Sequence, residues 1–106
     1  MAAERVYLAC SGGFSTSVLV KKLTELAAER GVDVTIEFIS EMQLGSIPED
    51  TLLVLLAPQV AFRRENLRRT LPSENIALEL IDRVAYGRAD AEAVLRQIEQ
   101  RLQLKE

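Results

Sequence analysis

The chain has 106 residues, of which 48% are apolar and 27% are charged, a balance typical of soluble globular proteins. This length allows one modest hydrophobic core, so we expect residues 1–106 to form a single domain. The net charge of −3 and the pI near 5.1 argue against a nonspecific nucleic-acid binder and against a protein that binds anionic membranes.

The chain contains one cysteine and no histidine. These counts exclude an internal disulfide and the usual Cys/His zinc sites, and we expect neither a metal nor a cofactor. Without imidazole, neither a Ser-His-Asp nor a Cys-His hydrolase can be built. No apolar run reaches the ~20 residues that span a bilayer, and the first residues, MAAERVYLAC, lack a secretory signal. We therefore predict a cytoplasmic protein that does not insert into a membrane.

The first half of the chain alternates strand and helix patterns. Residues 6–9 predict a short buried strand, and residues 15–30 predict a helix that ends at Gly31. The predicted inner face of this helix consists of Val18, Leu19, Leu23, Leu26 and Ala27. Residues 32–39 alternate apolar and polar side chains, which is typical of a half-exposed strand at a sheet edge. Residues 40–50 are irregular, with one helical turn and a loop.

The second half continues this alternation. Residues 51–57 are apolar without a break, which predicts a strand covered on both faces and ended by Pro58. Residues 59–71 predict a helix, with Val60, Leu67 and Leu71 on one side. Residues 76–81 predict a fourth strand. Asp90 is the expected N-cap of a final helix whose inward residues are Val94, Leu95, Ile98 and Leu102.

Alternating strands and helices predict an α/β fold with a single four-stranded parallel sheet and helices on both faces. The edge character of the second strand and the buried character of the third predict the strand order 2-1-3-4. Ligands of such sheets bind outside the carboxyl ends of the strands where the winding direction reverses. Here that place lies between the first and third strands, and Cys10 ends the first strand.

The loop from Cys10 to Ser17 joins this strand to the start of a helix. Gly12 and Gly13 allow a ligand to approach the backbone closely, and the helix start offers unpaired N–H groups to an anion. Hydroxyl groups come from Ser11, Ser15, Thr16 and Ser17. We expect the pKa of the Cys10 thiol to lie below its free value of about 8.5. The loop therefore suits a covalent phosphocysteine, whereas the simpler interpretation is a packing cysteine before a tight turn.

Three segments, taken together, resemble one protein family. ACSGGFSTSVLVKK (9–22) resembles the phosphorylation loop of the lactose/cellobiose/chitobiose-type IIB components of the bacterial sugar phosphotransferase system. LLVLLAPQVAF (52–62) and ELIDRVAYGRADAEAVL (79–95) resemble two later blocks of that family, in the same order. The resemblance implies a cytoplasmic, single-domain phosphotransferase with the strand order given above.

The resemblance also implies roles for particular residues. Cys10 would accept a phosphoryl group from a phosphohistidine on the IIA partner and pass it to a sugar bound by the membrane component IIC. The sugar would be a β-linked disaccharide such as cellobiose, chitobiose or lactose. The phosphate loop would comprise Ser11, Gly12, Gly13, Phe14, Ser15, Thr16 and Ser17. Pro58, Gln59 and Tyr86 would lie on the rim or contact a partner. Ala91 departs from the glycine that members often carry, at a position with no catalytic role.

Two other classes of protein compete with this interpretation. A low-molecular-weight phosphatase needs an arginine six positions after its cysteine, where this chain has Thr16. Its acid would be Asp82, which is equally well explained as an exposed turn residue. A receiver-like regulator needs carboxylates at two strand ends that hold Cys10 and Ala57. The phosphatase is therefore the main alternative, and an inert relative that only binds is a further one.

Two surface features allow two interpretations each. The arginines of the helix after the central strand either steer an acidic or phosphorylated partner or form a solvated helix face; they are Arg63, Arg64, Arg68 and Arg69. Three aromatic residues either form one apolar patch at the carboxyl end of the sheet, where IIA and IIC dock, or are isolated on the surface; they are Phe14, Phe62 and Tyr86.

Overall fold

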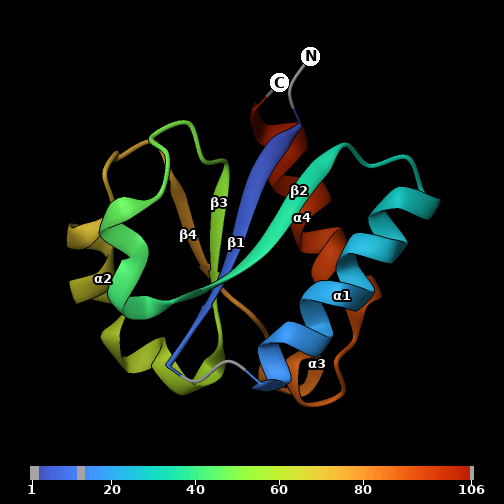
Figure 1. Ribbon diagram of the computed structural model, residues 1–106, viewed down its shortest axis with the longest axis horizontal. Helices are drawn as coiled ribbons and strands as arrows, with labels where there is room; N and C mark the ends of the chain where they lie inside the picture. Colours follow the sequence, from blue (N-terminus) through green and yellow to red (C-terminus); the bar gives the residue numbers. More distant parts are fainter. Residues whose placement is uncertain (1–2, 12–13, 106) are drawn as a thin grey trace.

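The computed structural model describes residues 3–11 and 14–105, except for the side chains of residues 14–16. Its centre is a four-stranded parallel sheet of β1 (Glu4–Cys10), β2 (Val34–Ser40), β3 (Leu53–Leu56) and β4 (Ala77–Leu80). The strand order is β2-β1-β3-β4, which confirms the predicted order (Figure 1). The carboxyl ends of all four strands therefore lie along one edge of the sheet.

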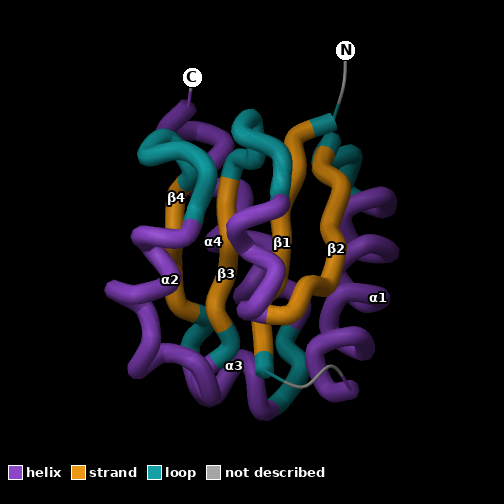
Figure 2. Tube along the Cα trace, turned by 60° about the vertical axis from the view of Figure 1, so that its left-hand side comes forward, coloured by secondary structure: helices purple, strands orange, loops and turns teal. Residues whose placement is uncertain are grey.

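Helices cover both faces of the sheet, as predicted. One face packs against α1 (Phe14–Glu29) and α4 (Ala91–Lys105). The other packs against two 3-10 helices, η1 (Glu41–Ser46) and η2 (Pro58–Arg63), and against α2 (Arg64–Thr70). A short helix, α3 (Arg83–Gly87), lies at the carboxyl end of the strands (Figure 2).

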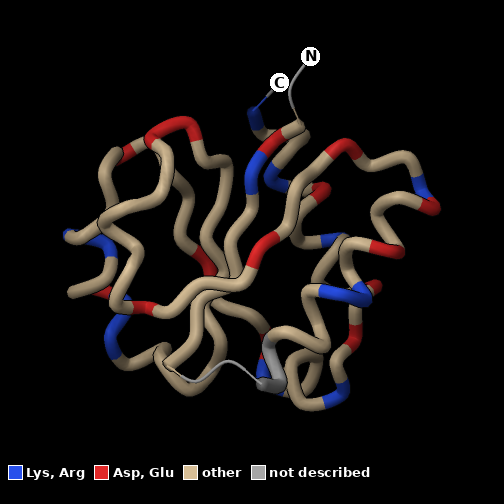
Figure 3. The backbone as a smooth tube through the Cα atoms, viewed as in Figure 1, with Lys and Arg blue, Asp and Glu red and all other residues tan. Residues whose placement is uncertain are grey.

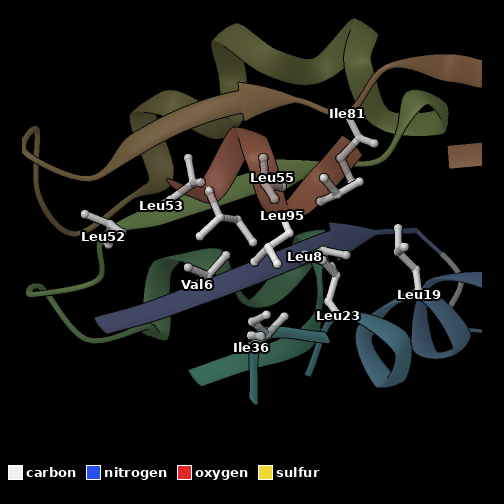
Figure 4. Close-up of a cluster of buried hydrophobic side chains, with 13 residues drawn as sticks. Val6, Leu8, Leu19, Leu23, Ile36, Leu52, Leu53, Leu55, Ile81 and Leu95 are labelled. Atoms are coloured by element: carbon white, nitrogen blue, oxygen red, sulfur yellow. The ribbon is translucent and has the colours of Figure 1, made fainter. Parts of the chain in front are cut away.

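The alternation of side chains along β1 divides the buried residues into two clusters. Val6 and Leu8 point to the α1 and α4 face and pack with Leu23, Leu55 and Leu95 (Figure 4). Tyr7 and Ala9 point to the opposite face and pack under η2 and α2, with Val54, Leu56, Val60 and Leu67. Both faces of the central strands are therefore shielded from water, which explains their unbroken apolar sequences.

Several local signals in the sequence are confirmed. Gly31 has a φ of 66°, the left-handed conformation that ends a helix at C′. The side chain of Asp90 accepts a hydrogen bond from the backbone N–H of Ala93 at 3.1 Å, as an N-cap does. Strand β2 lies at the edge of the sheet, and residues 41–46 form a helical turn in the segment that was expected to be irregular.

Other boundaries differ from the predictions. The helix expected over 59–71 consists of η2 followed by α2, because apolar spacing does not distinguish a 3-10 turn from the first turns of an α-helix. Helix α3 was not predicted, because five residues are too few to show a helical period. Val18, expected on the inner face of α1, is 46% exposed, whereas Leu19, Leu23 and Ala27 are buried and Leu26 is partly buried against the core.

Leu55 provides a test of the core. Its side chain is fully buried in the middle of β3, and we expect Leu55→Ala to lower the free energy of unfolding by about 2–5 kcal/mol. The control is Leu104→Ala, at a side chain that is 73% exposed, which should change it by less than about 0.5 kcal/mol. Urea denaturation measures both values, and equal effects would contradict this assignment of the core.

Candidate active site

Cys10 is the last residue of β1, and its side chain is only 2% exposed. Its Cα pairs with that of Ser40 at the end of β2, and on the other side Ala57 donates its N–H to the carbonyl of Ala9 at 3.0 Å. Cys10 therefore lies at the carboxyl edge of the sheet, at the end of β1. The winding direction of the sheet reverses between this strand and β3. This is the place at which parallel α/β sheets bind their ligands.

Helix α1 begins at Phe14, a few residues beyond the cysteine, and its first turn contains no acidic residue. No acidic side chain of the helix therefore neutralises the positive end of its dipole. Ser11 and Ser17 are exposed beside it. Gly12 and Gly13 lie outside the described residues, as do the side chains of Phe14, Ser15 and Thr16. The phosphate loop proper therefore stays a prediction.

Tyr86 reaches the cysteine from a distant part of the chain. Its hydroxyl lies 3.9 Å from the sulphur of Cys10, across a separation of 76 residues. The ring is half-buried and packs against the core cluster between the sheet and α1 and α4. Tyr86 was predicted to lie on the rim or to contact a partner; the structure places its hydroxyl beside the sulphur.

The other two residues assigned to the rim start η2. Pro58 is half-buried at the first position of this helix, and Gln59 next to it is exposed. Both follow Ala57, which is hydrogen-bonded to the residue before Cys10. Both therefore lie near the carboxyl edge of the sheet, and their role on the rim or in contact with a partner stays a prediction.

Asp82 holds the helix that carries Tyr86. Its carboxylate oxygen Oδ2 accepts hydrogen bonds from the backbone N–H groups of Val84 and Ala85, each at 3.0 Å. These are the bonds of an N-cap. The side chain is therefore explained by the local structure of the turn, which is the simpler of the two interpretations given for it.

One buried charged residue was missed by the sequence analysis. Glu41 is 7% exposed and forms an ion pair with Arg63, and its second oxygen, Oε2, has no partner among the described residues. It directly follows Ser40 and ties η1 to η2 beneath the site. Nothing in the sequence distinguishes it from an exposed glutamate, since it follows a strand whose polar residues face water.

The arginines of η2 and α2 have specific partners. Arg64 donates to the carbonyl of Leu78 at 3.3 Å, and Arg68 donates to those of Ile76 and Ser73 at 2.6 and 2.9 Å. Their guanidinium groups cover the open edge at β4, and the basic residues of α2 gather there (Figure 3). Charged side chains at an edge strand oppose edge-to-edge association. Three of the four arginines, counting Arg63, thus have a structural role.

Exposed apolar side chains gather at the carboxyl end of the sheet. Among the described residues, large apolar side chains that are exposed there come from α1, β2, η1, η2, β4 and α3; these are Val18, Phe38, Met42, Phe62, Leu80 and Val84, called the apolar rim below. Phe62, 85% exposed, borders a hollow of about 520 Å³ with Leu80 and Arg83. Residues 6–20 and 51–62 carry no charged side chain (Figure 3).

Residues 3–11 and 14–105 contain neither a cluster of metal-ligating side chains nor a membrane-spanning helix. No group of three or more metal-ligating side chains comes together in this part of the chain. No helix there is long and apolar enough to cross a membrane.

The fold and the site together define a class of protein: a parallel α/β domain with a buried cysteine at the end of its first strand, before the N-terminus of a helix. Comparison with known families agrees with this class. The model of the family "PTS system, Lactose/Cellobiose specific IIB subunit" matches residues 5–97. The chain therefore belongs to the lactose/cellobiose-specific IIB family of the sugar phosphotransferase system, and it is a phosphotransferase component.

Individual relatives match along most of their length. The oligo-beta-mannoside-specific EIIB component of Bacillus subtilis is 34% identical over 94 residues, covering 89% of this chain and 91% of that protein. The cellobiose-specific EIIB component of Lactococcus lactis is 32% identical over 100 residues, covering 90% and 93%. The solution structure of a cellobiose-specific IIB component from Borrelia burgdorferi has a TM-score of 0.76 and 33% identity, covering 97% and 94%. These relatives favour the IIB assignment over the phosphatase alternative.

The cap at Asp82 gives a test of how α3 is held. Asp82→Ala removes an acceptor from two backbone N–H groups, and we expect a loss of about 1 kcal/mol in the free energy of unfolding. Asp82→Asn keeps an acceptor oxygen and should retain most of the stability. Thermal or urea denaturation of the two variants decides the matter; an equal loss in both would show that the negative charge, and not the cap, is what matters.

Proposed function

We propose that this chain carries a phosphoryl group on Cys10, taking it from a phosphohistidine of a IIA protein and giving it to a sugar bound by a membrane IIC protein. In this role residues 1–106 act as one domain in the cytoplasm. The observation that carries the proposal is the position of Cys10, at the carboxyl end of β1 and just before α1.

The start of α1 supports the proposal because it suits the anion that the reaction moves. Unpaired backbone N–H groups at a helix N-terminus bind phosphate oxygens, and the missing acidic residue leaves their attraction intact. The amides of residues 11–17, with Gly12 and Gly13 among them, are the donors that we assign to the phosphoryl group. The same dipole favours the thiolate over the thiol before transfer.

Transfer proceeds in two displacements. In the first, the sulphur of Cys10 attacks phosphorus, the S–P bond forms as the P–N bond breaks, and the imidazole of IIA leaves with the electron pair and takes up a proton. In the second, a sugar hydroxyl oxygen attacks phosphorus, the S–P bond breaks, and the sulphur leaves as thiolate while the hydroxyl proton is released. The protein supplies position and hydrogen-bond donors for both steps.

The residue at position 16 explains why water does not hydrolyse the phosphocysteine before the sugar arrives. Cysteine phosphatases clamp the phosphoryl group with an arginine at this point of the loop, and here it is Thr16. Without the bidentate cation, the loop binds the phosphoryl group and does less to stabilise its attack by water. A carrier needs this, because hydrolysis before the sugar arrives loses the group.

In this proposal the sugar that receives the phosphoryl group is a β-linked disaccharide such as cellobiose, chitobiose or lactose. The related proteins are named for oligo-β-mannosides, galactose and cellobiose at similar identities, so likeness to any one of them does not select a sugar. Sugar selection then lies in the IIC partner, because the carrier contacts the sugar only through the transferred group.

The apolar rim is the surface at which we place the IIA partner. Its side chains lie on the elements that meet at the end of the sheet that carries Cys10. Residues 6–20 and 51–62 are uncharged, and among the described residues Arg83 is the one charged residue that lines the hollow, so docking there desolvates few charges. Phe62 is the most exposed side chain of the rim and borders its hollow, so it is the residue most suited to fill a pocket on a partner. The rest of the rim excludes water around it.

Intact mass tests the role of Cys10. After incubation with phosphoenolpyruvate, the general phosphotransferase proteins and a cognate IIA, the wild type should gain one phosphoryl group and Cys10→Ser should gain none. A serine hydroxyl stays protonated where no base activates it, so it does not replace the thiolate. Leu104→Ser, at an exposed position at the far end of α4, is the control and should still be phosphorylated on Cys10. A phosphoryl group on the Cys10→Ser chain would refute the assignment.

The docking surface has its own test. Phe62→Ser should raise the KM for phosphorylated IIA by about tenfold, because a buried aromatic anchor commonly contributes more than 1 kcal/mol to an interface. Leu104→Ser removes another exposed apolar side chain, 73% exposed at the far end of α4, and should leave KM unchanged. Equal effects of the two substitutions would place the IIA interface elsewhere.

A further inference from the structure

We propose that Tyr86 is a catalytic residue: its hydroxyl donates a hydrogen bond to the sulphur of Cys10 and stabilises the thiolate both as nucleophile and as leaving group. The inference rests on the proposed role of Cys10 and goes beyond it, since Tyr86 was expected to face a partner. The contact that carries it is the 3.9 Å separation of the cysteine Sγ and the tyrosine Oη.

The chemistry of the two groups sets the direction of this bond. In a neutral pair, either the thiol or the phenol can donate. A thiolate can only accept, so the tyrosine becomes the donor as the sulphur ionises, and a hydrogen bond to a charged acceptor is stronger than one between neutral groups. The contact therefore favours the thiolate over the thiol.

Burial makes this donor important. The side chain of Cys10 is 2% exposed, and water solvates a thiolate there poorly, which by itself disfavours the charged form. The segment from Val6 to Val20 carries no charged side chain, so it supplies no cation of its own. The charged groups at the start of the neighbouring elements have other surroundings: Glu41 of η1 pairs with Arg63, Asp82 caps α3, and Arg83 borders the hollow beside Phe62. Donors aimed at the sulphur must replace the lost solvation, and the Tyr86 hydroxyl is one of them.

The backbone around Tyr86 fixes the position of that hydroxyl. Asp82 caps the start of α3, and the N–H of Tyr86 donates to the carbonyl of Asp82 at 2.9 Å. The helix ends at Gly87, and two residues further on Ala89 has a φ of 49°, an uncommon conformation for a residue with a side chain. Its N–H donates to the carbonyl of Tyr86 at 3.1 Å, and that of Asp90 donates to Ala85 at 2.8 Å. Hydrogen bonds therefore hold both ends of the short helix, and the half-buried ring of Tyr86 packs on the core.

The same bond serves both displacements. While sulphur is bonded to phosphorus it is a weak acceptor, and the hydrogen bond contributes little. As the S–P bond breaks, negative charge returns to sulphur and the bond strengthens. Tyr86 thus stabilises the thiolate in each direction without taking part in a covalent step.

Because the chain has one cysteine, its ionisation is measured without interference. Protein labelled with ¹³C at the cysteine Cβ gives a single resonance whose shift follows the thiol to the thiolate during a pH titration. We expect Tyr86→Phe to move the midpoint to higher pH and to reduce the thiolate present at neutral pH by about threefold to tenfold. An unchanged midpoint would overturn the proposal.

Tyr7→Phe is the matched control. It removes the same hydroxyl from the only other tyrosine, which lies on β1 but points to the opposite face of the sheet, away from Cys10. Its titration should coincide with that of the wild type. A shift as large as that of Tyr86→Phe would mean that any lost tyrosine hydroxyl has this effect, and it would likewise overturn the proposal.

Transfer kinetics separate catalysis from docking. Tyr86→Phe keeps the ring, so phosphorylation by IIA should show a kcat reduced by about threefold to tenfold with an unchanged KM. A raised KM with an unchanged kcat would instead make Tyr86 a contact for the partner. If the wild type accepts no phosphoryl group at all, the proposed function fails, while the titration of the isolated protein still decides the role of Tyr86.

Discussion

The two parallel ladders of β1 are the constraint on which the rest of the site depends. Pairing with β2 on one side and β3 on the other places β1 where the winding reverses, and five consecutive residues from Val6 to Cys10 are buried. Because side chains alternate along a strand, the register also decides which way the sulphur points. It faces α1, α4 and the ring of Tyr86. A register shift of one residue in β1 would point the sulphur toward η2 and α2, away from the Tyr86 hydroxyl.

The carboxyl edge combines a local motif with distant supports. The cysteine and the start of α1 come from one short segment, whereas Tyr86 comes from a helix 76 residues away that is tied at both ends. The side chains of the apolar rim lie on the elements that meet at this edge, and residues 6–20 and 51–62 carry no charge. A single such edge leaves one docking surface for the donor and the acceptor of the phosphoryl group. In the proposed cycle they must therefore bind in turn.

The placement of the charged residues is consistent with a carrier and not with a phosphatase. Arginines are present in number, but Arg63 pairs with the buried Glu41, and Arg64 and Arg68 cover the open edge of β4. None of these replaces the cation that a cysteine phosphatase holds in its loop, where this chain has Thr16. Asp82, the other group that a phosphatase would need, caps α3 with its carboxylate. The chain thus combines the proposed nucleophile and anion site with the absence, among the described residues and at position 16, of the groups that promote hydrolysis.

The sequence by itself determined the strand order, the two-sided cover of the sheet and the place of Cys10, because these follow from apolar periodicity, caps and breaks that act locally. It also limited the chemistry, since a chain without histidine leaves few nucleophiles. Only the tertiary structure brought the Tyr86 hydroxyl to the sulphur, buried Glu41 against Arg63 and gave the arginines of α2 their carbonyl partners. The contact of Tyr86 spans 76 residues and that of Glu41 spans 22, whereas Arg68 reaches a carbonyl only 8 residues further along the chain. Their side chains look like ordinary surface residues until packing decides which of them meet.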